Sequence, residues 1–318
     1  MKTVYFTEKA FNIHKVFDPD VTAYNRDYIV AHPEEFADTE YMFTSWGMVA
    51  LTEEEIRRCL PKLKAVFHGA GTVQHFARPF LNCGVRVFSA WAANAIPVAE
   101  YTVAQIVLAN KGFYETMRFR NKEDARVIAR RYPGNYGAKV GIIGAGMIGK
   151  LVIRMLKNYT LDVLVFDPFL PDETAKELGV EKVSLERLFA ECNVVSNHLA
   201  DNAETKGMLR GSHFASMLPD ATFLNTARGA QVVEDELIAV LKARPDLTAV
   251  LDVTEPEPPL PGSELYDLPN CILTPHVAGS SGNEVKRMGQ YMRQQQKNVE
   301  NGDPCQYEVT LEMLKTMA

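Results

Sequence analysis

Short apolar runs alternate with amphipathic segments along most of the chain. In the first hundred residues, the runs at 3–6, 41–44, 65–68 and 85–88 predict strands. A second series is predicted at 139–143, 162–166, 193–197, 222–225, 248–251 and 271–274. Strands that alternate with helices form parallel sheets. The pattern therefore predicts an α/β protein with two Rossmann-like or flavodoxin-like domains, each built on a parallel sheet.

Two long helical segments are predicted where one series gives way to the other. The first is expected from Val98 to about Met117, with Pro97 at its first position, where a missing N–H costs nothing. The second is a helical stripe after Ser281 that ends at Gly302 and returns the chain to the first series. We therefore expect a discontinuous domain, residues 1–98 and 284–318, and a second domain at 99–283.

Composition and charge narrow the class of protein. Hydrophobic residues make up 47% and charged residues 23% of the chain, which is typical of a folded globular protein. A formal net charge of -6 argues against nucleic-acid or anionic-membrane partners. The five cysteines include no C-x-x-C pair, so no metal site is expected. The N-terminus lacks the apolar core of a signal peptide, which favours a cytoplasmic location.

A glycine motif follows the first strand of the second series. Gly144, Gly146 and Gly149 have G-x-G-x-x-G spacing and directly precede a helical pattern. Such glycines allow a tight turn, a close approach of backbone to a pyrophosphate and close packing of helix on strand. Asp167 ends the next strand, where a carboxylate accepts hydrogen bonds from a ribose diol and repels a 2′-phosphate. The motif predicts NAD as cofactor, in contact with Gly144, Gly146, Met147, Ile148, Gly149 and Asp167.

Three chemically active residues follow successive strands of the same series. Arg228, Glu257 and His276 stand where parallel strands bring their carboxyl ends to one edge of the sheet. A guanidinium can bind a carboxylate and a neighbouring oxygen together. An imidazole titrates near neutral pH and can exchange a proton with a hydroxyl, and a carboxylate can fix its tautomer. Each residue alone is usually structural, but the three together favour a catalytic site.

The chain resembles the D-isomer-specific 2-hydroxyacid dehydrogenases. The resemblance rests on the glycine motif with Asp167 and on the stretches 94–108, 223–237, 252–258 and 273–279. It implies a substrate domain at 1–98 and 284–318, an NAD-binding Rossmann domain at 99–283, and a homodimer. It also implies a catalytic set of Arg228, Glu257 and His276. The implied cofactor set is completed by His198, Thr226, Ala227 and Asp252, and the implied substrate set is Ala70, Gly71, Arg228 and Trp46.

The function that follows is NAD-dependent interconversion of a 2-keto acid and a D-2-hydroxy acid. The alternative is a NAD(H)-sensing binding protein or corepressor of the same fold. Formate oxidation is disfavoured, because related formate enzymes carry glutamine where Glu257 stands. The identity of the 2-hydroxy acid, the physiological direction and the oligomeric state stay open at this point. So does the question of which of four residues line the substrate pocket: Trp46, His75, Arg78 and Trp91.

Overall fold

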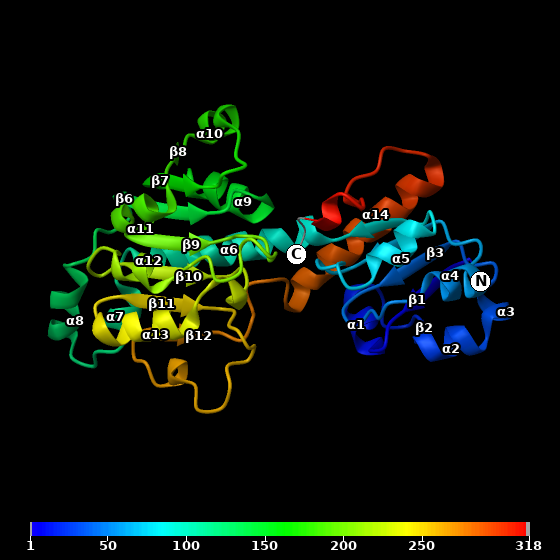
Figure 1. The fold of residues 1–318 in the computed structure, drawn as a ribbon, viewed down its shortest axis with the longest axis horizontal. Coiled ribbons are helices and arrows are strands. Elements are labelled where there is room, and N and C mark those ends of the chain that lie inside the picture. The colour runs from blue at the N-terminus through cyan, green and yellow to red at the C-terminus, as the bar shows by residue number, and fades with distance from the viewer. Residues whose placement is uncertain (1, 316–318) are drawn as a thin grey trace. The chain divides into compact units, whose positions relative to one another are not determined.

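The computed structural model describes residues 2–315, which fold into two compact units (Figure 1). Unit 1 consists of the chain up to Asn94 together with the segment from Ser280 onward. Unit 2 is the continuous segment Ala95–Gly279. Each unit has its own sheet and its own core, so each is described separately.

Unit 1 is built on a six-stranded sheet with the order β13-β5-β4-β3-β1-β2. Strands β1 to β5 are parallel, and their order is that of a flavodoxin-like fold. The edge strand β13, which was not predicted, is antiparallel to β5 and is the exception in an otherwise parallel sheet. Arg86 of β5 holds this edge with two hydrogen bonds to Glu308, at 2.8 and 2.6 Å. The strands are β1 (Thr3–Phe6), β2 (Ala23–Tyr24), β3 (Tyr41–Thr44), β4 (Ala65–His68), β5 (Arg86–Ser89) and β13 (Glu308–Val309).

Helices cover both faces of this sheet, because its strands are apolar on both sides. Val4, Met42 and Val66 enter one core, and their neighbours Phe43 and Phe67 enter the other. The second core includes Met288 and Met292 of the long helix α14. The helices are α1 (Ala10–Val16), α2 (Arg26–Ala31), α3 (Pro33–Phe36), α4 (Glu53–Cys59), α5 (Ala77–Asn82) and α14 (Val285–Asn301), with 3-10 turns η3 (Gly282–Glu284) and η4 (Met313–Lys315).

Unit 2 is built on a seven-stranded parallel sheet with the order β12-β11-β10-β9-β6-β7-β8. The order reverses between β6 and β9, which is the arrangement of a Rossmann fold. The predicted α/β fold with two parallel-rich sheets is thus confirmed. The strands are β6 (Tyr136–Ile143), β7 (Thr160–Phe166), β8 (Glu181–Lys182), β9 (Val194–Asn197), β10 (Thr222–Asn225), β11 (Thr248–Leu251) and β12 (Cys271–Leu273).

Helix α6 (Trp91–Ala109) differs from the prediction at both ends. It begins before the expected start, so Pro97 lies inside the helix rather than at its first position. Alanines at 92, 93 and 95 are buried and continue the apolar face, and this offsets the missing proline N–H. The helix ends before Gly112, whose φ of +68° breaks the helical path. A Cβ at Gly112 would also lie 2.3 Å from the Tyr132 ring.

The same helix is long and apolar enough to cross a membrane by length and composition alone. More than half of that stretch is buried, and Ala99, Val103 and Ile106 belong to the core on one face of the unit 2 sheet. It is therefore a core helix. The other helices of unit 2 are α7 (Phe113–Thr116), α8 (Lys122–Ala129), α9 (Met147–Leu156), α10 (Asp172–Leu178), α11 (Leu185–Glu191), α12 (Gly211–Ala215) and α13 (Glu234–Ala243), with 3-10 turns η1 (Gly229–Gln231) and η2 (Glu264–Tyr266).

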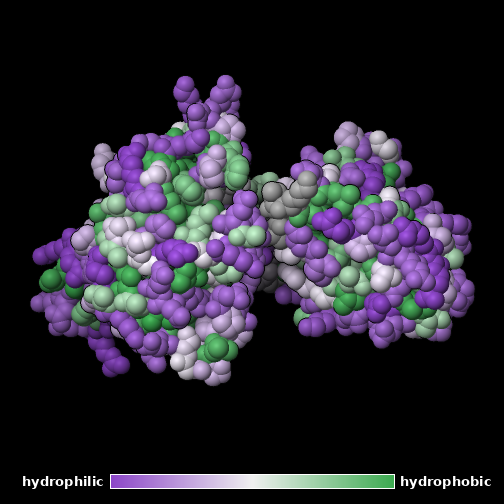
Figure 2. All heavy atoms as spheres, in the orientation of Figure 1, coloured by the Kyte–Doolittle hydropathy of each residue, from purple (hydrophilic) through white to green (hydrophobic). Residues whose placement is uncertain are grey.

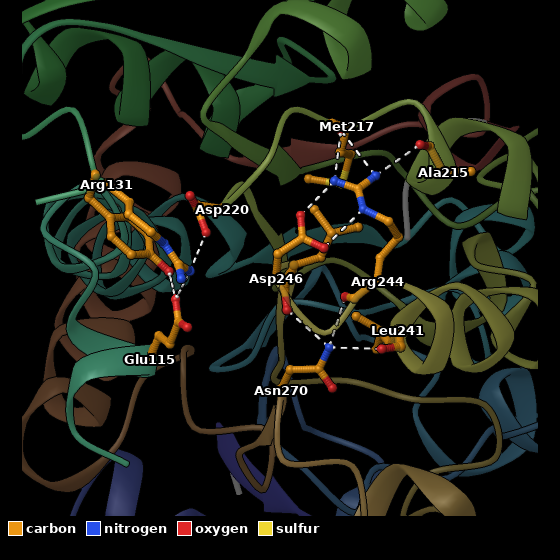
Figure 3. Close-up of polar contacts among 11 residues, drawn as sticks. Glu115, Arg131, Ala215, Met217, Asp220, Leu241, Arg244, Asp246 and Asn270 are labelled. Atoms are coloured by element: carbon orange, nitrogen blue, oxygen red, sulfur yellow. Dashed lines mark hydrogen bonds and ion pairs between the residues drawn. The ribbon is translucent and has the colours of Figure 1, made fainter. Parts of the chain in front are cut away.

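Polar clamps fasten the amino end of the unit 2 sheet (Figure 3). Asp220 and Asp246 precede β10 and β11, and bind Arg131 and Arg244 respectively. Arg131 also donates to Glu115 at 2.7 Å. Asn270, before β12, is buried and its amide donates to the carbonyls of Leu241 and Leu247, both at 3.0 Å. Because these polar groups are hydrogen-bonded within the protein, we assign this end of the sheet a structural role.

The surface is mainly polar. Figure 2 shows mostly hydrophilic residues on the visible face of each unit. The charged stretch 118–138 was predicted to be solvated. Helix α8 within it has no buried residue, as expected, but residues 136–138 begin β6 and Ala138 is buried, so the prediction is wrong at that end. In open parallel sheets, ligands bind outside the carboxyl ends of the strands. The polar residues that follow the unit 2 strands are therefore candidates for a binding site.

Candidate active site

A glycine turn joins β6 to α9 at the point where the strand order reverses. Gly144 has a φ of +87°, and a Cβ there would lie 2.8 Å from the carbonyl oxygen of His198. A Cβ at Gly149 would lie 2.0 Å from the carbonyl oxygen of Gly144. Only glycine fits either position, while the space around Gly146 is open. The turn is thus a backbone cradle with room above its middle residue.

The start of α9 leaves hydrogen-bond donors unused. Gly146 is the N-cap of this ten-residue helix and offers no side-chain cap. The first N–H groups of a helix have no intrahelical partner, so those of Met147 and Ile148 are free to bind an anion. An open cradle with free amides fits the pyrophosphate of a dinucleotide. These residues would hold that part of the cofactor.

Asp167 lies directly after β7 and beside the glycine turn. Its Oδ2 accepts from the Ala145 N–H at 2.7 Å, and its Oδ1 accepts from the Phe169 N–H at 2.8 Å. Two backbone donors therefore fix the carboxylate, and each oxygen keeps acceptor capacity. This arrangement suits the hydroxyls of a ribose and opposes a phosphate at the same place.

His198 follows β9, on the other side of the reversal point. Its Nε2 lies 2.9 Å from Ser196 Oγ, and its Nδ1 is buried with no partner within residues 2–315. Burial lowers the pKa of His198 to about 3, so the ring is neutral at physiological pH. It is therefore suited to hydrogen bonding rather than to proton exchange. Its predicted contact with the cofactor stays a prediction, as does that of Thr226, whose hydroxyl lies 3.3 Å from that of Thr102.

The structure brings His276 and Glu257 together from loops that follow two neighbouring strands, β12 and β11. His276 Nδ1 lies 2.6 Å from Glu257 Oε1. The His276 and Glu257 side chains are 45% and 40% exposed, so a ligand can reach the pair while the hydrogen bond keeps the two side chains together. With Nδ1–H donated to the carboxylate, Nε2 becomes the atom available for proton exchange.

Asp252 directly follows β11 and is buried. Its carboxylate accepts from Thr274 Oγ at 2.5 Å and from the N–H groups of Val277 and Ala278, both at 2.9 Å. The His276 N–H donates to the Asp252 carbonyl at 3.0 Å, and His276 has a φ of +52°. Asp252 therefore fixes the loop that presents the imidazole. Its expected contact with the cofactor remains a prediction.

Arg228 starts the turn after β10, directly after the buried Ala227. The guanidinium is partly buried and donates to the Ala227 carbonyl at 2.7 Å. A Cβ at Gly229 would lie 2.0 Å from the Thr254 carbonyl carbon, so this turn touches the Glu257 loop through backbone alone. The Glu255 N–H donates to Glu234 at 2.7 Å, and burial raises the pKa of Glu234. Glu234 was not predicted to be part of the site. Its position in the first turn of α13 gave no signal that its carboxylate binds the backbone at Glu255.

Of the predicted substrate residues other than Arg228, Trp46 follows β3, and Ala70 and Gly71 follow β4, so all three lie at the carboxyl ends of unit 1 strands. Ser89 Oγ donates to the carbonyls of Ala70 and Gly71, at 3.0 and 2.6 Å, and so fixes their loop. The Trp46 carbonyl accepts from Thr7 and Asn12, while its side chain is 39% exposed. His75 lies 3.0 Å from the Met48 carbonyl, Trp91 packs edge-on against Tyr307, and Arg78 lies in α5.

One group of possible metal ligands occurs among the described residues. His32, Glu34 and Glu35 bring ligand atoms within 4.8 Å of one another. All three are exposed, and such groups are common on protein surfaces without an ion.

Fold and glycine turn define unit 2 as a dinucleotide-binding domain. Residues 103–278 match the family model described as "D-isomer specific 2-hydroxyacid dehydrogenase, NAD binding domain". This match covers more than half of the chain, so the chain belongs to that family and unit 2 carries its NAD-binding domain.

Curated relatives agree with this assignment. D-3-phosphoglycerate dehydrogenase of Archaeoglobus fulgidus is 30% identical over 230 residues, which are 72% of this chain and 43% of the relative. Glyoxylate reductase of Korarchaeum cryptofilum is 37% identical over 155 residues, covering 49% and 47% of the two chains. The chain spans about half the length of the curated relatives it matches.

Solved structures share the fold over nearly the whole chain. An NAD-complexed D-isomer specific 2-hydroxyacid dehydrogenase of Lactobacillus delbrueckii ssp. bulgaricus matches with a TM-score of 0.79 at 19% identity, covering 98% of this chain and 100% of that one. D-mandelate dehydrogenase of Rhodotorula graminis matches with a TM-score of 0.79 at 21% identity, covering 97% of each.

Proposed function

We propose that the protein is an NAD-dependent oxidoreductase that interconverts a 2-keto acid and a D-2-hydroxy acid. The observation that carries the proposal is the His276–Glu257 contact of 2.6 Å on the carboxyl edge of a sheet that also carries a dinucleotide cradle. A binding protein would need the cradle but not the imidazole–carboxylate pair. An acid/base next to a hydride carrier is what reduction of a ketone requires.

Each of the three residues has a role that its geometry suits. His276 Nε2 gives a proton to the forming alkoxide in reduction and removes it in oxidation. Glu257 holds the imidazole through Nδ1 and fixes its tautomer. Arg228 binds the substrate carboxylate and orients the keto oxygen. Gly146, Met147 and Asp167 would hold NAD, which when bound would supply or accept the hydride.

Unit 1 is proposed to be the substrate domain, for which the sequence predicts residues 1–98 and 284–318, and unit 2 the NAD-binding domain, predicted at 99–283; the unit boundaries of the structure lie within four residues of these. Ser89 fixes the loop of Ala70 and Gly71 through their carbonyls, and the backbone N–H groups of this loop would suit a substrate carboxylate. Trp46 presents an exposed aromatic side chain at the end of β3 and is proposed to contact the substrate's variable group. A cytoplasmic location is proposed because all five cysteines are free and that compartment keeps thiols reduced.

The first prediction concerns turnover itself. At least one acid in a panel from glyoxylate through hydroxypyruvate to branched, aromatic and sugar-derived 2-keto acids is expected to oxidise NADH, followed by absorbance at 340 nm. NADPH is the paired control and is expected to react much more slowly, because Asp167 opposes a 2′-phosphate. If NADH binds tightly but no acid reacts, the enzyme proposal is wrong and a NAD(H)-sensing role takes its place.

A second prediction concerns assembly. We propose a homodimer formed through the segment 108–136 of unit 2, because six large apolar side chains stand exposed there: Leu108, Phe113, Met117, Phe119, Val127 and Tyr136. Sedimentation is expected to give twice the chain mass of 35.6 kDa. Met117→Lys should shift the protein toward the monomer, whereas the same change at exposed Phe11 of unit 1 should not. A monomeric wild-type protein would contradict the proposal.

A further inference from the structure

Three amide side chains form a buried cluster at the carboxyl end of the unit 2 sheet. Asn197 ends β9, Asn225 ends β10 and Gln231 ends the turn η1 that follows Arg228. All three are at most 1% exposed. Asn197 Nδ2 donates to Asn225 Oδ1 at 3.1 Å and to Gln231 Oε1 at 2.6 Å. One amide therefore joins two strand ends and the Arg228 turn.

The cluster fixes the backbone on both sides of Arg228. Asn225 Nδ2 donates to the Arg228 carbonyl at 3.0 Å, and Asn225 Oδ1 accepts from the Ala227 N–H at 3.1 Å. The Thr226–Ala227 and Arg228–Gly229 peptide groups are thus tied to a single buried side chain. These two bonds restrain the backbone from which the Arg228 side chain projects.

Gln231 extends the cluster to a second segment. Its Nε2 donates to the carbonyls of Leu199 and Ala200, at 2.9 and 3.0 Å. These residues directly follow His198, whose carbonyl borders the glycine cradle at Gly144. Through one amide group, Gln231 therefore contacts the segment beside the cradle and the amide of Asn197, which in turn donates to Asn225.

A buried amide is costly unless each of its polar atoms has a partner, and the apolar packing of a sheet does not require one. Here Asn197, Asn225 and Gln231 satisfy one another and five backbone groups at the edge where the candidate chemistry lies, the fifth being the Leu199 N–H, which donates to Asn197 Oδ1 at 3.2 Å. We propose that Gln231 is a positioning residue that holds the Arg228 turn in register with the 199–200 segment, so that the carboxylate-binding guanidinium and the cofactor cradle are aligned. This inference rests on the proposed function of Arg228.

The test compares two near-isosteric substitutions at opposite ends of the same sheet. Gln231→Met removes one amide of the cluster, and Asn270→Leu removes a buried amide that donates to three carbonyls but lies at the amino end. Both variants are expected to lower the melting temperature. Gln231→Met should in addition raise the KM for the 2-keto acid about tenfold, lower kcat, and weaken NADH binding measured by fluorescence titration. Asn270→Leu should leave all three unchanged in the folded protein.

Equal effects of the two variants on KM, kcat and NADH affinity would overturn the positioning role. If Gln231→Met does not fold, Gln231→Glu keeps the acceptor for Asn197 and loses the donors to Leu199 and Ala200, and the same rise in KM is expected. Arg228→Lys distinguishes the two levels of the argument. Normal kinetics of Arg228→Lys would refute the proposed role of Arg228. If Arg228→Lys is impaired but Gln231→Met has the same kinetic constants as Asn270→Leu, the role of Arg228 stands and only the positioning role of Gln231 is refuted.

Discussion

Replacement of His276 by alanine is expected to lower kcat by about 10²–10⁴-fold, the usual contribution of a general acid/base, while the affinity for NADH stays close to that of the wild type. The reason is geometric. The imidazole is bound to Glu257 through Nδ1 and belongs to a loop that Asp252 fixes, so its Nε2 is the part left for the substrate. Turnover is measured with the 2-keto acid that reacts best, and NADH affinity by fluorescence titration.

His213→Ala is the matched control. His213 also lies in unit 2; it is stacked on Phe189 with ring centroids 5.3 Å apart, and its Nδ1 accepts from the Arg210 N–H. Its loss should cost stability without lowering kcat in the folded protein. Wild-type turnover of His276→Ala would remove the imidazole from the mechanism, and a loss of NADH binding equal to the loss of turnover would assign it to cofactor binding instead.

The elements that the sequence predicts well are those with a strong local signal. The strands at 3–6, 41–44, 65–68, 222–225 and 248–251 have the predicted bounds, because each is a short, mainly apolar run; the last four are buried on both sides, and the first on one side. The G-x-G-x-x-G turn was also identified, since a strand, three glycines and a helix in that order leave few alternatives. Strands β2, β8 and β13 were missed because two residues make no pattern.

The rest of the candidate site depends on contacts between distant residues. Nothing local at Asp252 indicates that its carboxylate accepts three hydrogen bonds from residues 274–278. The partners of Gln231 lie more than thirty residues away in sequence, at Asn197, Leu199 and Ala200. A polar residue within an apolar stretch, such as Gln231, indicates a buried hydrogen bond, but it does not indicate which residue is the partner. Such hydrogen-bond networks form only once the sheet has brought distant strand ends together. They could therefore not be predicted from local patterns in the sequence.

The two ends of the unit 2 sheet use similar residues for different purposes. At the amino end, Arg244 is bound to Asp246 and to the Met217 carbonyl, so its donors are spent on the fold (Figure 3). At the carboxyl end, the one contact of the Arg228 guanidinium among the described hydrogen bonds is with the adjacent Ala227 carbonyl. A guanidinium that the fold holds by its backbone keeps most of its donors for a ligand. This contrast supports the assignment of Arg228 to the substrate carboxylate.

Arg228→Lys is therefore expected to raise the KM for the 2-keto acid and to lower kcat together, with a combined loss of about 10- to 100-fold in kcat/KM. Lysine keeps the charge but loses the planar fork that binds a carboxylate and an adjacent oxygen at once. The affinity for NADH should not change, because the substituted group is not part of the cradle formed by Gly144, Gly146 and α9.

The comparison is made with Arg244→Lys, which removes the same fork at the opposite end of the sheet. That variant should have a lower melting temperature and wild-type kinetic constants, because its bonds stabilise the fold. Normal kcat/KM in Arg228→Lys would exclude bidentate carboxylate binding at this position. A raised KM with unchanged kcat would mean that the arginine binds the carboxylate equally in the ground and transition states, since only an interaction that strengthens in the transition state lowers kcat when it is lost.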